Sequence, residues 1–358
     1  MIRRIYLSLF FLLFSSLSFS ADVELNPEHP QKYTVVRGDT LWDISGTFLK
    51  YPWHWPAIWQ VNSQIENPHL IYPGDLLTLV YRDGKPVLEL TRGPTAYKMS
   101  PEVRDITLEK AIPTIPLDAI KAFLTRPQVL DEDTLKLAPY IVAGADERLI
   151  LGAGDRVYAR GFENENDKNF SVFTQGEVYK DSESQEVLGY EAIYKGSAWL
   201  TEMGDPATAE LRETKLEVLV GDRMLPAVEE DYEMNFIPHS PEQGIDGHII
   251  SVFNGVSQVG QYQIVVLDRG DRNGLEVGHV LNIHQVGKTV VDTVLSGRED
   301  ETYFNTHNKG VDRNQMVKLP DEYAGVAMVF KSFEKVSYAI VMKAVRAIHL
   351  KDKVSAAN

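Results

Sequence analysis

The 358-residue chain contains no cysteine, which excludes disulfide scaffolds, thiolate metal sites, cysteine nucleophiles and a lipidated N-terminal cysteine. Basic residues are scarce, because 36 Lys and Arg stand against 51 Asp and Glu, for a formal net charge of −15. Nucleic acids and anionic lipid surfaces select clustered positive charge, so neither is an expected partner. The 25 Gly and 18 Pro are too few for a collagen-like or low-complexity chain.

Long apolar runs are also missing, except near the N-terminus. Two arginines precede a stretch from Ile5 to Phe14 that one serine interrupts, and Ser18-Phe19-Ser20 puts small residues where a signal peptidase reads. The run is short for a hydrocarbon layer about 30 Å thick, so it predicts a signal peptide over residues 1–20 rather than a membrane anchor. We expect a mature chain without a transmembrane segment, and the lack of cysteine favours the periplasm.

The mature chain divides into three regions of different pattern. A compact domain is expected at residues 31–82, followed at residues 83–138 by a linker with a short helix from Leu117 to Leu124. Residues 139–354 have short β-rich runs punctuated by Gly and Asp, which is typical of an all-β region. We expect one barrel-like module there or two, with a break near residues 227–247. The predicted fold class is α+β, a small βααβ domain followed by a mostly-β C-terminal region.

A short pattern recurs in the β-rich region. Gly154-Asp155-Arg156-Val157 is similar to Gly221-Asp222-Arg223-Met224, and Gly278-His279-Val280-Leu281 is a third variant. Glycine permits positive φ, and an Asp side chain can hydrogen-bond its own backbone. We therefore interpret the pattern as a repeated β-turn at the entrance to a barrel strand.

The N-terminal domain has a strand–helix–helix–strand pattern. Tyr33 to Val36 is rich in β-branched residues, and Thr40 is a candidate N-cap with Asp43 three residues later, where its carboxylate can reach the cap. Pro56 suits the first turn of a second helix. Leu76 to Val80 then returns as a strand, so the unit is compact and mixed in structure.

Two motifs of this domain, Tyr33-Thr-Val-Val-Arg-Gly-Asp-Thr-Leu-Trp-Asp-Ile44 and Asn67-Pro-His-Leu-Ile-Tyr-Pro-Gly-Asp-Leu-Leu77, resemble the LysM domain family. The resemblance implies a βααβ fold that binds N-acetylglucosamine-containing glycans in a shallow groove between two loops. In a secreted bacterial protein this glycan is peptidoglycan. The glycan-binding residues that the resemblance implies are Gly38, Asp39, Thr40 and Leu41 on one wall, and Asn67, Pro68, Leu70, Ile71, Tyr72 and Pro73 on the other.

The chemistry of an acetamido sugar agrees with such a groove. Backbone groups of the loops can pair with its amide, and Leu41 or Ile71 can cover its methyl group. One shallow groove predicts a dissociation constant of roughly high micromolar to millimolar. The stretch Trp53-His-Trp-Pro56 has two interpretations, a surface for sugar stacking or the packing of an extended interhelical loop, and packing is favoured.

Motifs of wall hydrolases are missing from the sequence. It contains no His-Glu-x-x-His, no His-x-His and no Gly-x-Ser-x-Gly elbow. Ser332-Phe-Glu-Lys335 lacks the motifs that accompany a catalytic Ser-x-x-Lys, and Glu183-Ser184 lies in a polar stretch typical of a hairpin tip. We therefore expect no enzyme, no catalytic residue, no cofactor and no metal site.

Segments of the C-terminal two thirds resemble a group of proteobacterial LysM proteins, the TsaP family, which is associated with the type IV pilus secretin. They are residues 112–118, 138–142, 154–160, 188–192 and 336–341. The C-terminal region of that family is related to the flagellar T-ring protein FlgT. The resemblance implies a periplasmic, cell-wall-associated protein whose LysM domain holds the wall and whose β-region contacts the outer-membrane secretin. The alternatives are a cell-wall hydrolase with an unrecognised catalytic site and a flagellar basal-body accessory protein.

Overall fold

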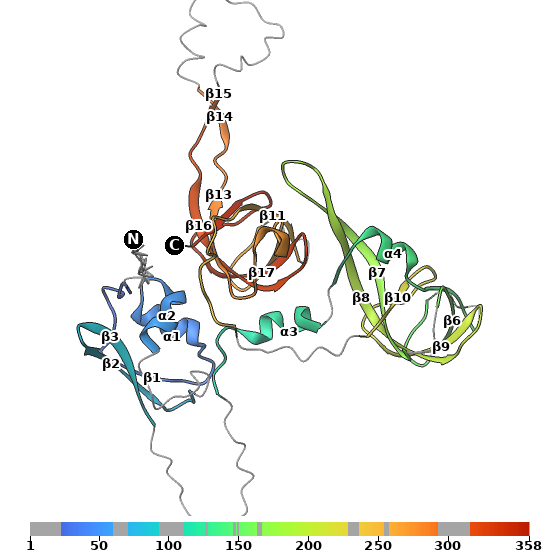
Figure 1. Ribbon diagram of the computed structural model, residues 1–358, viewed down its shortest axis with the longest axis horizontal. Coiled ribbons are helices and arrows are strands. Elements are labelled where there is room, and N and C mark those ends of the chain that lie inside the picture. Colours follow the sequence, from blue (N-terminus) through green and yellow to red (C-terminus); the bar gives the residue numbers. More distant parts are fainter. Residues whose placement is uncertain are drawn as a thin grey trace, which may run out of the picture.

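The computed structural model describes residues 23–59, 71–92, 111–125, 128–145, 148, 150–162, 167–227, 236–253, 258–292 and 316–357. The expected signal peptide at residues 1–20 lies outside these ranges. Within them the chain forms a small N-terminal domain and a mostly-β region with closed barrels (Figure 1). The predicted α+β fold class is therefore confirmed.

The N-terminal domain is a three-stranded antiparallel sheet with two short helices. Its elements are β1 (Lys32–Thr34), α1 (Leu41–Phe48), the 3-10 helix η1 (Pro52–His54), α2 (Trp55–Trp59), β2 (Leu76–Arg82) and β3 (Lys85–Thr91). Apolar side chains from both helices and from the sheet form one buried core, which includes Leu41, Phe48, Trp55, Ile58 and Leu77. The order β1-α1-α2-β2 is the expected βααβ unit.

Residues 83–138 carry more structure than the expected linker with one helix. Asp83 and Gly84 both have positive φ and make a tight turn, after which β3 pairs with β2 along all seven of its residues. The expected helix is present as α3 (Leu117–Thr125), and it is followed by β4 (Gln128–Leu130) and α4 (Glu132–Leu137). Strand β3 was not predicted, because its apolar residues alternate with charged residues next to a turn and lie within the expected linker.

Two barrels make up most of the remaining described residues (green to yellow and orange to red in Figure 1). The first contains β5 (Tyr140–Gly144), β6 (Arg156–Arg160), β7 (Asn169–Lys180), β8 (Val187–Glu202), β9 (Ala207–Thr214) and β10 (Arg223–Pro226). Its sheet has the order β4-β8-β7-β10-β5-β6-β9, and β9 also pairs with β8. Strands β5 to β10 therefore close into a barrel, with β4 as an extra strand beside β8.

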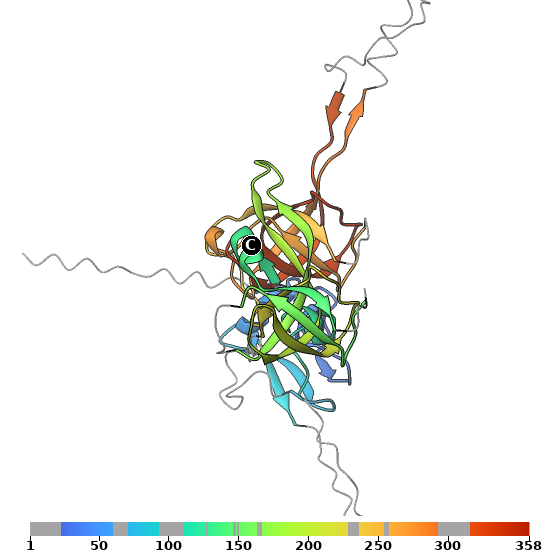
Figure 2. The same ribbon diagram turned by 90° about the vertical axis from the view of Figure 1, so that its right-hand side faces the viewer.

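The second barrel is closed in the order β11-β12-β17-β16-β13-β18. Its elements are β11 (Asp246–Val252), β12 (Ile264–Leu267), the 3-10 helix η2 (Asp271–Asn273), β13 (Val280–Gln285), β16 (Glu322–Ser332), β17 (Ser337–Ala344) and β18 (Lys353–Ala356). Beyond the barrel, the β13–β16 hairpin continues as the two-stranded ribbon β14 (Thr289–Val291) and β15 (Met316–Lys318). This ribbon, the arm, projects away from the barrel in both views (Figures 1 and 2).

The two barrels share one topology. In each, the first strand pairs with the second and the sixth, and the fifth pairs with the second and the fourth. Their turn contacts also match, because the N–H of Gly221 donates to the Ile141 carbonyl and the N–H of Lys351 donates to the Ile249 carbonyl. The chain therefore contains the same barrel twice.

One type of turn recurs in all three modules. The fourth residue donates its N–H to the carbonyl of the first, its side chain accepts the N–H of the first, and the third residue has positive φ. These turns span residues 36–39, 72–75, 152–155, 219–222, 260–263, 276–279 and 349–352. Three of them are the Gly-Asp and Gly-His patterns of the sequence analysis, so the prediction of a repeated β-turn is confirmed.

The two barrels contact each other at the tip of the β7–β8 hairpin. The Glu186 carboxylate of the first barrel accepts hydrogen bonds from Arg272 at 3.0 and 3.2 Å and from Lys335 at 3.0 Å. Beside it, Arg269 donates to Asp181 at 2.9 Å. The three cations belong to the second barrel, and both carboxylates belong to the first.

The pKa values of these two carboxyl groups are lowered for different reasons. Arg272 and then Lys335 lower the pKa of Glu186 to about 2. The pKa of Asp181 is also lowered to about 2, chiefly because Ser184 of the same hairpin tip donates its N–H. A pKa lowered in the docked state favours docking above the ordinary Glu value of 4.5, and this contribution is lost as the pH falls towards 2.

The first prediction concerns the third position of the equivalent turns, where φ is 96° at Gly221 and 70° at Lys351. A side chain in this region costs about 1–2 kcal/mol. We expect Gly221→Ala to lower the free energy of unfolding by about that amount, whereas Lys351→Gly raises it by up to about 1 kcal/mol. Urea unfolding followed by far-UV circular dichroism measures both. Changes of the same sign would contradict this account of the turn.

The second prediction uses the pKa of Glu186 as a reporter of barrel docking. In the double variant Arg272→Ala/Lys335→Ala we expect this pKa to rise towards 4.5, because both cations that lower it are gone. The pKa of Asp181 should stay low, since its main hydrogen bond is local. Carboxyl NMR titration measures both groups in one sample. A Glu186 midpoint that stays near 2 would show that the second barrel does not set it.

Candidate functional site

The first wall of the expected cleft is built around the start of α1. Thr40 is its N-cap, as predicted, and accepts the N–H of Asp43 at 3.1 Å while donating its hydroxyl to the Asp43 carboxylate at 2.6 Å. Just before it, Asp39 accepts the N–H of Val36 at 2.9 Å and the hydroxyl of Tyr33 at 3.1 Å. These bonds fix the loop that carries Gly38, which is exposed and has positive φ.

The second wall leads into β2. The N–H of Tyr72 donates to the Asp75 carboxylate at 3.0 Å, and Arg92 pairs with the same carboxylate at 2.6 Å. The backbone of this wall is hydrogen-bonded to the residue that follows β1, because Gly74 donates to the Val35 carbonyl at 2.8 Å and Val35 donates to the Asp75 carbonyl at 2.9 Å. The two walls are therefore held at a fixed separation.

Asn67, Pro68 and Leu70 lie outside the described residues. The other predicted glycan-binding residues fall on the two walls, and their contact with a glycan stays a prediction. Leu41 and Ile71, which we expected to cover a sugar methyl group, are both buried. Their burial comes in part from a segment of this chain that the sequence analysis did not connect with the cleft.

That segment is residues 112–114. The N–H of Leu41 donates to the Pro113 carbonyl at 2.9 Å, and the N–H of Trp42 donates to the Thr114 carbonyl at 3.1 Å. On the other wall, the Ile71 carbonyl accepts the N–H of Ile112 at 2.8 Å. The segment therefore bridges the two walls. The segment is part of residues 112–118, which resemble the TsaP family, and Pro113 and Pro116 favour extended chain. Neither signal pointed to a contact with the cleft.

The tryptophans of the N-terminal domain are buried in two separate clusters. Trp55 and Trp59 belong to the core of the domain itself. Trp42 and Trp53, whose ring centroids are 6.3 Å apart, belong to a cluster that is completed by the second barrel. Packing is therefore the correct interpretation of this stretch, but the partner of Trp53 is a barrel rather than the interhelical loop alone.

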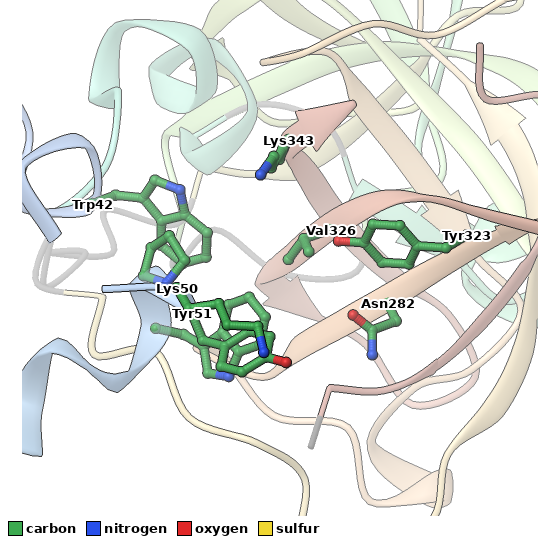
Figure 3. Close-up of a pocket in the computed structure, with 9 residues that line it drawn as sticks. Trp42, Lys50, Tyr51, Asn282, Tyr323, Val326 and Lys343 are labelled. Atoms are coloured by element: carbon green, nitrogen blue, oxygen red, sulfur yellow. The ribbon is translucent and has the colours of Figure 1, made fainter. Parts of the chain in front are cut away.

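A pocket of about 370 Å³ lies at the junction of the N-terminal domain and the second barrel (Figure 3). Its lining residues are Trp42, Lys50, Tyr51, Pro52, Trp53, Asn282, Tyr323, Val326 and Lys343. In Figure 3 the side chains of Tyr323 and Asn282 lie across the pocket from Tyr51. Aromatic walls with a few polar groups suit a small polar ligand. The pocket shares Trp42 with the cleft, so the two features are neighbours.

Three potential metal ligands, His239, Glu276 and His279, gather elsewhere, with their ligand atoms within 4.8 Å of one another. Nδ1 of His279 accepts the N–H of Glu276 at 3.0 Å in one of the repeated turns. A neutral ring that accepts at Nδ1 carries its proton on Nε2, and a protonated nitrogen cannot bind a metal. Metal binding would break the turn, so we assign His279 to the turn.

The two sequence patterns that partly match catalytic motifs, Glu183-Ser184 and Ser332 with Lys335, lie at hairpin tips. Ser184 donates its hydroxyl to Asp181 at 2.9 Å between β7 and β8, and Ser332 donates to the Leu275 carbonyl at 3.1 Å at the end of β16. Lys335 is engaged with Glu186. These side chains have structural partners.

Residues 33–80 match the LysM domain family. The chain is also similar to an uncharacterized protein, YqbP of Bacillus subtilis, at 40% identity over 60 residues. That match covers 14% of this chain and 27% of the relative, so the chain spans about a quarter of the length of the protein it matches. The N-terminal domain is therefore a LysM domain, and LysM domains generally bind peptidoglycan. Within the described ranges no helix has the length and apolar character needed to cross a membrane.

Proposed function

We propose that this protein is a non-catalytic peptidoglycan-binding anchor of the bacterial envelope, located in the periplasm after removal of residues 1–20. The observation that carries the proposal is the LysM domain with its two walls. Across the cleft, the N–H groups of Leu41 and Trp42 point into the same gap as the Ile71 carbonyl, since one short segment contacts all three. An N-acetyl group presents one carbonyl and one N–H, which is the complement of this arrangement.

Binding at one such cleft is weak, with a dissociation constant on the order of high micromolar to millimolar. A ligand of the cleft needs no charge, because the groups that contact residues 112–114 there are backbone amides and apolar side chains. Peptidoglycan is a polymer with many copies of its disaccharide, so a high local concentration of sites retains a weak binder. This favours a role in holding position on the wall over a role in capturing free sugars.

An anchor needs a second surface for what it holds in place. The arm at β14 and β15 supplies one, because its apolar side chains Val290, Val291, Met316 and Val317 are exposed. Exposed apolar patches mark sites of protein interaction. With the resemblance to the TsaP family, this supports the outer-membrane secretin of the type IV pilus as the partner. A flagellar basal-body partner and a wall hydrolase are the alternatives, and dye release from labelled peptidoglycan tests the latter.

The third prediction tests the wall of the cleft with two matched tyrosines. Tyr72 lies on the second wall with the Arg92 guanidinium over its ring, whereas Tyr81 is 62% exposed, near the other end of β2. We expect Tyr72→Ala to reduce the fraction that sediments with insoluble peptidoglycan about fivefold, the effect of losing roughly 1 kcal/mol of contact. Tyr81→Ala should sediment like the wild type. Equal sedimentation of a chain that lacks residues 33–80 would rule out the cleft.

The fourth prediction concerns the partner. Cells without the protein should show disordered secretin foci and impaired twitching, because the secretin loses its attachment to the wall. A chain in which residues 289–318 are deleted, and with them both strands of the arm, should keep its sedimentation with peptidoglycan and lose co-purification with the secretin from crosslinked cells. Normal foci and normal twitching in the deletion strain would reject the secretin, and a defect in swimming alone would favour the flagellar alternative.

A further inference from the structure

The start of α1 shows why residues 112–114 lie where they do. A helix leaves its first N–H groups without intrahelical partners. In α1 the side chain of Thr40 satisfies the N–H of Asp43, and the carbonyls of Pro113 and Thr114 satisfy those of Leu41 and Trp42. The segment therefore supplies the acceptors that would otherwise come from water or from a ligand.

The contacts of the segment are those that an acetamido sugar would make. A backbone amide and an N-acetyl group are the same functional group, a carbonyl joined to an N–H. The Pro113 carbonyl accepts at one wall, and the Ile112 N–H donates to the Ile71 carbonyl at the other. These two hydrogen bonds have N···O distances of 2.9 Å (Leu41 to Pro113) and 2.8 Å (Ile112 to Ile71), which are ordinary for amides. The cleft is therefore complementary to an amide group.

The apolar contacts repeat this correspondence. Ile112 is 5% exposed and packs in the same cluster as Leu41 and Ile71, the two side chains expected to cover the sugar methyl group. Thr114 and Ile115 are also buried. The N–H groups of Leu41 and Trp42 each donate one proton, which the segment already accepts, and Ile112 fills the space beside Leu41. A glycan and this segment therefore cannot occupy the cleft together.

We propose that residues 112–114 are an internal competitor that closes the LysM cleft, and that glycan binds when this segment leaves. The inference rests on the proposed function, because it takes the cleft as the glycan site. The measured dissociation constant is then the intrinsic one divided by the fraction of molecules with an open cleft. The wall anchor is held in a low-affinity state by its own chain.

The segment also connects the cleft to the second barrel. It continues through Ile115 into α3, and Ile115 and Ile120 pack in the cluster that contains the barrel residues Val326 and Met328. The ring centroid of Phe123 lies 4.7 Å from that of Phe253, the residue that follows β11. A partner that shifts α3 on the barrel would open the cleft, and by reciprocity glycan binding would loosen α3.

The fifth prediction replaces Ile112 by a charge that its buried site disfavours. We expect Ile112→Asp in the full chain to bind chitopentaose about tenfold more tightly than the wild type, as measured by titration calorimetry. This is the change expected if the fraction of molecules with an open cleft rises from roughly a tenth to nearly one. Ile150→Asp is the matched control, because Ile150 is exposed in the first barrel and the change in charge is the same. Its affinity should equal that of the wild type.

Equal affinities of Ile112→Asp and the wild type would overturn the competition and leave the proposed function intact. If neither chain binds chitopentaose or peptidoglycan, the proposed function itself fails. Amide exchange on the unchanged protein gives a second test that needs no variant. Saturation with chitopentaose should speed exchange of the Ile112 N–H as it leaves the Ile71 carbonyl, and a glycan-bound protein in which this N–H stays equally protected would reject the internal competitor.

Discussion

The backbone N–H groups at the start of α1 are donors that the helix cannot satisfy, and much of the arrangement follows from how they are paired. Thr40 satisfies one from within the domain, and the carbonyls of Pro113 and Thr114 reach the others from a segment far along the chain. That segment is held in turn by Ile115 and α3 in the cluster of the second barrel. The LysM domain, α3 and the second barrel are therefore linked through one segment, by hydrogen bonds at one end and by apolar contacts at the other.

The repeated turn acts at a shorter range in the same way. The side chain of its fourth residue accepts the N–H of its first residue. The chain can therefore reverse direction before the next strand or helix without leaving that N–H unpaired. Because Asp, Gln and His can all accept this bond, the turn tolerates different residues in the two barrels. Gly154 is matched by Tyr262, and Gly221 by Lys351, each with positive φ.

These local features explain how much the sequence could predict. The N-cap at Thr40, the βααβ order, the helix that begins at Leu117 and the Gly-Asp turns are all set by neighbours within a few residues, so pattern reveals them. The duplicated barrel was hidden because Gln263 and Lys351 replace the Asp and Gly that mark the turn in the first copy. The contact of residues 112–114 with the cleft could not be predicted, since its hydrogen bonds join residues about 40 and 70 positions apart through backbone atoms that carry no sequence signature.

The burial of Trp42 and Trp53 against the second barrel has a consequence for the order in which the protein matures. A chain that is synthesised from its N-terminus completes its LysM domain before β18 closes the second barrel, which covers these two side chains. Until then Trp42 and Trp53 are not buried by the barrel, and α3 has no barrel core against which to pack. The newly made protein therefore passes through a stage in which its LysM domain is folded but not yet held against a barrel, and the last strand completes that contact.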